Sequence, residues 1–206
     1  MHEGQRAEQE GQQVVHHWTV RLWHWANVAA MAVMVPSGWR IYNAAPIWSG
    51  WVFPKTYTLG GWLGGALQWH FAGMWVFGAG LVLHAIVSVA RGHIWRRLLP
   101  VEAGALVQEL RLALMGRLGH ADQAHYNQPQ RLAYLSALLG LFALLASGLV
   151  LWKSVQFPVL RELLGGYEGA RRVHFLAMCL VLGFVALHLL MVVLVPRTLL
   201  AMLRGH

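Results

Sequence analysis

The chain has 206 residues, of which 57% are hydrophobic and only 12% are charged, and its formal net charge is +8. An ordinary soluble domain is about half apolar and about a quarter charged. This composition therefore excludes a disordered chain and disfavours a water-soluble globule. The single cysteine, Cys179, excludes an intramolecular disulfide and any zinc or iron–sulfur site built from several thiolates. The sequence predicts an integral membrane protein.

Four stretches contain no Asp, Glu, Lys or Arg, and they are 18, 20, 21 and 24 residues long: 22–39, 71–90, 132–152 and 173–196. About 20 residues of helix cross the hydrocarbon core. These stretches are continuously apolar rather than alternating, which favours helices over a barrel. We therefore predict one all-α domain over residues 1–206, a four-helix transmembrane bundle with spans at about 20–42, 66–91, 131–153 and 170–196. Pro36 lies inside the first span and predicts a kink there.

The segments outside the spans are polar or rich in turn-forming residues. The first fifteen residues lack the charged-then-apolar order of a signal peptide, so the first span is expected to remain as an anchor. Residues 43–65 form a loop rich in Gly, Trp and Pro. Residues 98–130 form a polar linker, in which the helical periodicity of 101–118 predicts a surface-lying helix.

The basic residues report the orientation of the chain. Ten of the 16 Lys and Arg lie on the side that holds both termini and the loop after the second span, and six lie on the other side. The positive-inside rule then places both termini in the cytoplasm. Because the charge is spread over loops and is not gathered on one soluble face, it predicts contact with membrane lipids and no nucleic-acid partner.

Four histidines lie in or beside the spans in two pairs, His70 with His84 and His174 with His188. The members of each pair are 14 residues apart. Because this is close to four helical turns, they face the same way at depths about 21 Å apart. The second and fourth spans run in the same direction, so the two pairs reach matched depths. Such helices can each supply one axial ligand to two stacked haems.

Other interpretations of these histidines stay open at this point. An intramembrane histidine can simply hydrogen-bond to a neighbouring helix. His24, which lies between Trp23 and Trp25 at the mouth of the first span, suits an interfacial anchor as well as a ligand. The sequence has no C-x-x-C-H motif, so any haem is expected to be bound non-covalently.

A set of short motifs is similar to one family of membrane cytochromes. They are RLWHW and PSG in the first span, WHF opening the second, GHIWRRLLP after it, YNQPQRLAY before the third, and ARRVHF opening the fourth. Together they resemble the thiosulfate reductase cytochrome b subunit family, which is related to the cytochrome b subunits of nickel–iron hydrogenase and formate dehydrogenase. The resemblance runs from about Val15 to the C-terminus.

The resemblance implies two b-type haems and four axial ligands. His70 and His174 would hold the periplasmic haem, and His24 and His188 the cytoplasmic one. His84 departs from the family pattern, and by depth alone it is an alternative partner for His188. Arg21 and Arg171 lie beside proposed ligands, where they can pair with haem propionates or merely flank the spans.

The resemblance also implies a function. These subunits sit in the bacterial inner membrane and pass electrons between quinone or quinol and a redox partner protein. Here the partner is expected to be a periplasmic molybdopterin-type oxidoreductase. The chain would then be an electron-transfer subunit without catalytic residues of its own.

Two other functional classes remain open. The first is an autonomous quinone-linked membrane oxidase or reductase of a small diffusible oxidant. The second is a haem-free transporter. The lack of Asp and Glu inside the spans argues against the transporter, because cation and proton pathways usually recruit carboxylates.

Overall fold

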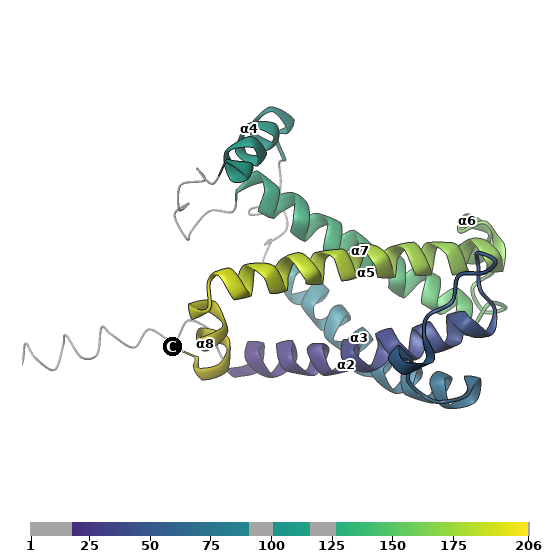
Figure 1. Cartoon of the computed structure of the whole chain (residues 1–206). Helices are drawn as coiled ribbons and strands as arrows, with labels where there is room; N and C mark the ends of the chain where they lie inside the picture. Colours follow the sequence, from purple (N-terminus) through teal and green to yellow (C-terminus); the bar gives the residue numbers. More distant parts are fainter. Residues whose placement is uncertain (1–17, 91–100, 116–126, 206) are drawn as a thin grey trace, which may run out of the picture. The chain divides into compact units, whose positions relative to one another are not determined.

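The computed structural model describes residues 18–90, 101–115 and 127–205, and every regular element in these ranges is helical (Figure 1). In chain order the elements are α2 (Trp18–Ala44), η1 (Lys55–Tyr57), α3 (Leu63–Ala90), α4 (Ala103–Leu114), α5 (Gln128–Trp152), α6 (Pro158–Leu163), α7 (Gly166–Leu194) and α8 (Arg197–Arg204). The prediction of an all-α protein is confirmed for the described residues. The surface helix predicted at 101–118 is present as α4, and its last three predicted residues lie outside the described ranges.

Three of the described helices are long and apolar enough to cross a membrane: Leu63–Val87 in α3, Gln128–Trp152 in α5 and Gly166–Leu194 in α7. They match the predicted second, third and fourth spans. The 27-residue α2 is as long as α5, but its two arginines and many polar and Trp residues make it less apolar. By length and composition, the structure therefore supports three of the four predicted crossings, and the first stays a prediction.

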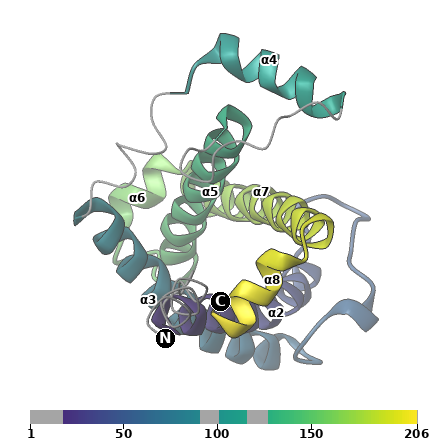
Figure 2. The same cartoon turned by 90° about the vertical axis from the view of Figure 1, so that its left-hand side faces the viewer.

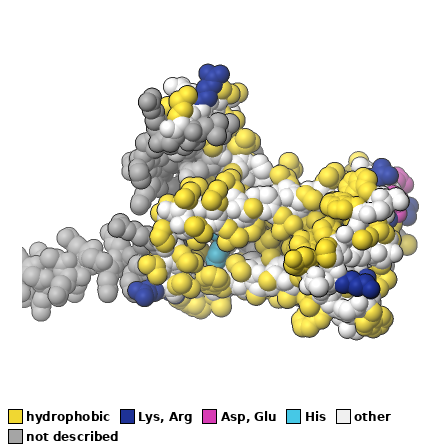
Figure 3. Space-filling model, in the orientation of Figure 1, with side chains coloured by type: hydrophobic (Ala, Val, Ile, Leu, Met, Phe, Trp, Pro, Cys, Tyr) yellow, Lys and Arg dark blue, Asp and Glu magenta, His cyan; other side chains and the backbone are white. Residues whose placement is uncertain are grey.

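Apolar side chains cover the long helices on their outer faces. Val193, Leu139 and Trp75 expose 75%, 68% and 63% of their surface. On the face shown in Figure 3, hydrophobic side chains run along α2 and α7, and Lys and Arg side chains lie toward the helix ends. Continuous exposed apolar surface of this kind marks a region that contacts lipid or protein instead of water.

The described residues belong to two compact units, Met1–Gly80 with Leu187–His206, and Leu81–Ala186. In the first unit α2 packs closely on α3, because Gly73 lies where a Cβ atom would come within 2.6 Å of Met34 Cγ. The loop after α2 is held by Asn43, whose side-chain amide donates to the Phe53 carbonyl (2.7 Å) and whose oxygen accepts from the Phe53 amide (2.8 Å). The first described helix, α2, and the last one, α8 (Arg197–Arg204), both belong to this unit.

In the second unit α5 packs on α7 at a glycine. A Cβ atom on Gly140 would lie 3.0 Å from Val181 Cγ2, so the small residue permits close approach. Glu109 of α4 accepts a hydrogen bond from the first amide of α5, that of Gln128 (2.7 Å), which ties the surface helix to the start of α5. Gly165 and Gly166 have φ of 78° and 79° between α6 and α7, a left-handed conformation that favours glycine.

Candidate functional site

His70 lies on α3 and is held by α2. Its Nδ1 atom is 3.2 Å from the Ser37 hydroxyl oxygen and 3.0 Å from the Met34 carbonyl oxygen. Ser37 is fully buried. A Cβ atom on Gly38 would lie only 3.3 Å from His70 Cε1, so the ring lies against a bare stretch of α2 backbone. The position of this imidazole is therefore well defined within the first unit.

His174 lies on α7 and is held by α5 in a similar way. Its Nδ1 atom is 3.0 Å from the hydroxyl oxygen of Ser147, which is also fully buried. A Cβ atom on Gly148 would lie 3.4 Å from His174 Cε1. His174 belongs to the second unit and His70 to the first.

His24 of α2 and His188 of α7 lie together in the first unit. Their ring centroids are 6.3 Å apart, with an angle of 65° between the planes. Metal–imidazole nitrogen bonds are about 2.0–2.1 Å long, so two rings that share one metal have centroids roughly 6 Å apart. This spacing fits a pair of axial haem ligands. The pairing of His24 with His188 that the resemblance implies is thus compatible with the structure.

The competing ligand, His84, is placed on α3, but its side chain lies outside the described residues. The choice between His24 and His84 as the partner of His188 therefore stays a prediction.

Arg21 lies at the start of α2 and bonds to the end of α8. Its Nε donates to the Met202 carbonyl (3.0 Å), and its Nη2 donates to the Leu203 carbonyl. These bonds use two of the five guanidinium N–H donors. A cation placed there also complements the partial negative charge at the C-terminal end of a helix. The predicted contact of Arg21 with a haem propionate would have to use its other donors.

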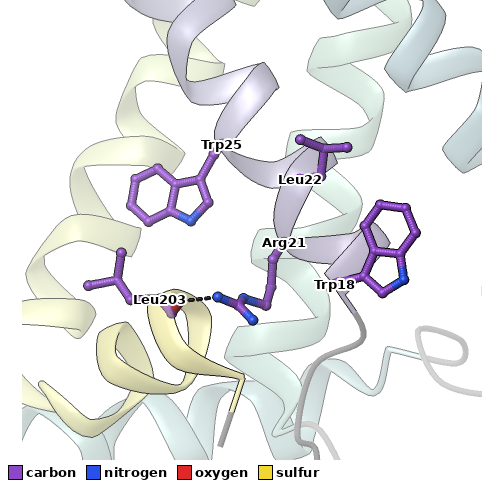
Figure 4. Close-up of a pocket in the computed structure, with 5 residues that line it drawn as sticks. All are labelled: Trp18, Arg21, Leu22, Trp25 and Leu203. Atoms are coloured by element: carbon purple, nitrogen blue, oxygen red, sulfur yellow. Dashed lines mark hydrogen bonds between the residues drawn. The ribbon is translucent and has the colours of Figure 1, made fainter.

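An open pocket of about 520 Å³ surrounds Arg21. Figure 4 shows Trp18, Leu22 and Trp25 of α2 and Leu203 of α8 around the guanidinium group. Among the described residues its walls are apolar and aromatic, and Arg21 is the charged group, with carbonyl partners on α8.

Arg171, the other arginine predicted to pair with a propionate, forms an ion pair with Glu168 on the same helix (2.8 Å). The pair lies in the first turns of α7, three residues before His174.

Ser37, Gly38, Ser147 and Gly148 were not predicted as site residues. The available signal was a Ser–Gly dipeptide that occurs once in the first predicted span and once in the third. Its contact with histidine, however, depends on how neighbouring helices pack.

Most of the chain is similar to known membrane cytochromes. Residues 15–205 match the family described as prokaryotic cytochrome b561. The putative protein-methionine-sulfoxide reductase subunit YedZ1 of Azospira oryzae is 52% identical over 192 residues, which is 93% of this chain and 96% of that protein. No solved structure matches the chain.

These findings confirm the prediction of a haem b-binding membrane cytochrome of electron transport. They support the broader family, whereas the relative is named as a protein-methionine-sulfoxide reductase subunit and not as a thiosulfate reductase subunit. The chain belongs to the prokaryotic cytochrome b561 family.

Proposed function

We propose that this protein is the membrane subunit that carries electrons between the quinone pool and an oxidoreductase partner, through two non-covalently bound b haems. The observation that carries the proposal is the His24–His188 pair, whose centroid separation of 6.3 Å suits two ligands of one iron. His70 and His174 would hold the second haem. Their pairing with each other rests on the family resemblance, since they lie in different units.

The protein's own groups would position and insulate the cofactors. Haem b supplies one-electron redox chemistry when bound, and the side chains around it set its position and electrostatics. Arg21 and Arg171 would supply cationic donors to the propionates. The exposed apolar faces of α5 and α7 would keep lipid, not water, around the site.

The arrangement of the helices supports α2 as a fourth crossing. If α3, α5 and α7 each cross once, the start of α3 and the end of α7 lie on opposite sides of the membrane. The end of α2 leads into α3, whereas its start is bonded through Arg21 to α8, which follows α7. Figures 1 and 2 show α8 beside the N-terminal end of α2. In that case α2 would also cross, and the start of α2 would share one side of the membrane with α8. The charge bias favours the cytoplasm for that side, with the subunit in a bacterial inner membrane.

The partner would be a molybdopterin-type enzyme that reduces oxidised methionine. The relative from Azospira oryzae is named as a subunit of a methionine sulfoxide reductase, and 52% identity over nearly the whole chain supports a similar partner here. A quinol would give up two electrons and two protons. The sulfoxide would take up two electrons and two protons to yield the thioether and water.

The proposal is tested in native membranes that contain the protein. We expect decylubiquinol or menadiol to reduce the b haems under anaerobic conditions, and methionine sulfoxide added next to reoxidise them. Thiosulfate is the matched control oxidant and should leave them reduced. Haems that neither quinol reduces would contradict the quinone link, and reoxidation by thiosulfate alone would contradict the proposed partner.

A further inference from the structure

The same Ser–Gly dipeptide contacts a histidine at two separate places in the fold. Ser37 and Gly38 of α2 contact His70 of α3, and Ser147 and Gly148 of α5 contact His174 of α7. The hydroxyl-to-Nδ1 distances are 3.2 and 3.0 Å, and the hypothetical Cβ-to-Cε1 distances are 3.3 and 3.4 Å. Two helix pairs in different units therefore build the same local arrangement.

At the first place the hydrogen bonds fix which ring nitrogen carries the proton. The Ser37 hydroxyl donates its one hydrogen to the Val33 carbonyl (2.7 Å), so its oxygen can only accept from His70. The Met34 carbonyl, 3.0 Å from the same Nδ1 atom, is also solely an acceptor. His70 Nδ1 must therefore carry a hydrogen and donate it.

The same reasoning applies at the second place. The Ser147 hydroxyl donates to the carbonyl of Ala143 in its own helix, with the Leu144 carbonyl 3.3 Å away. A Ser147 hydroxyl that donates to Ala143 can only accept from His174 Nδ1, and this arrangement is the tautomer with the hydrogen on Nδ1. In a neutral imidazole with a hydrogen on Nδ1, the lone pair that binds a metal is on Nε2.

Both serines lie where a hydroxyl group would destabilise the fold unless it formed hydrogen bonds. They are fully buried, and a buried polar group without a partner destabilises a protein. The bond to a carbonyl one turn earlier is common for serine in any helix. The unusual feature is the second bond, from a histidine of another helix, together with a glycine that lets the ring lie against the backbone.

We propose that Ser37 and Ser147, each aided by the following glycine, are positioning residues that orient His70 and His174 so that Nε2 binds the haem iron. This inference rests on the proposed function, because it assumes that both histidines are ligands. An acceptor on the far nitrogen of a ligating histidine fixes its tautomer and raises its basicity. The serines would therefore also lower the reduction potential of the haem, by favouring the ferric state.

The test uses the full-length protein in detergent, with Ser37→Ala and Ser147→Ala. We expect each variant to lose haem to excess apomyoglobin roughly 10–100-fold faster, as for other losses of a ligand's hydrogen-bond partner. We also expect the potential of the affected haem to rise, which a merely structural role would not produce. In Ser37→Ala, the His70 ring still has the Met34 carbonyl as an acceptor. The ring should therefore be held less firmly but keep its orientation.

Ser136→Ala is the matched control. Ser136 lies on α5 and also donates to the carbonyl four residues earlier, that of Leu132 (2.6 Å). It should leave haem loss and potentials unchanged. If an alanine variant does not assemble, Ser37→Cys and Ser147→Cys, which keep a weaker acceptor, should show the same shifts at smaller size.

The outcomes separate this inference from the proposed function. If the serine variants match the wild type in haem loss and in potential, while His70→Ala and His174→Ala remove haem, the positioning role is overturned and the proposed function stands. If the two histidine variants also keep all their haem, the ligand assignment of the proposed function has failed.

Discussion

The imidazole rings of His24 and His188 meet although 164 positions separate them in the chain. His24 is on α2 and His188 is on α7, so local sequence preferences cannot bring the two rings together. The contact depends on the packing of the first unit, which brings α2 together with the C-terminal end of α7. It is therefore the most informative residue-scale feature for assigning ligands.

Single histidine substitutions test this assignment. We expect His24→Ala and His188→Ala to lose the same haem, because they remove opposite ligands of one iron, and His174→Ala to lose the other. The measurement is the haem-to-protein ratio, with the potential of the haem that remains. His84→Ala should keep both haems. If instead His84→Ala and His188→Ala lose a haem while His24→Ala keeps it, His84 is the ligand.

The sequence singles out the histidines as candidate ligands, whereas it does not indicate the residues that contact them. Two pairs of histidines with the same 14-residue spacing are easily recognised in otherwise apolar segments. A serine in a helix, by contrast, is expected to bond to its own backbone, as Ser37 and Ser147 do. Nothing in the sequence places a histidine of another helix about 3 Å away, because that depends on helix rotation and on small residues at the crossing.

At the scale of elements, the long helices begin earlier than predicted. The structure begins α5 at Gln128 and α7 at Gly166, whereas the predicted spans begin at 131 and 170. Their first turns are polar and lie outside the apolar windows that defined the spans. The Gln130 side chain accepts from the Asn127 amide and helps to begin α5 (3.2 Å).

The short helices α6 and α8 were not predicted. The first begins at Pro158, in the loop after the third predicted span, and the second follows Pro196, which was taken as the end of the fourth. Proline is well suited to the first turn of a helix, so such a residue can begin one helix where another ends. Sequence alone did not distinguish these two possibilities.

The contact of Arg21 with α8 predicts that the stability of α8 depends on α2. Replacing Arg21 by Met removes a cation and its hydrogen bonds from the end of α8, and should lower the free energy of unfolding by about 1 kcal/mol. We expect a lower Tm in detergent and faster trypsin cleavage after Arg204. Arg111→Met, on α4, removes the same charge elsewhere and should change neither. Unchanged cleavage after Arg204 in the Arg21 variant would contradict the role of this contact.

At the scale of the whole molecule, the apolar composition, the exposed apolar helices and the family all indicate that the protein lies in a membrane. The 12% of charged residues is too few to cover a soluble protein of this size. The same composition explains why membership of a membrane family could be predicted from sequence. The particular partner could not, since no short motif in the sequence specifies which protein the subunit binds.

The central claim is that the chain carries two b haems. The direct measurement is a dithionite-reduced minus air-oxidised absorbance spectrum of the purified full-length protein, made with ample haem supply, together with a pyridine haemochrome assay. We expect a b-type spectrum and two haems per chain. One haem per chain would contradict the two-site assignment, and a colourless protein would contradict the electron-transfer function altogether.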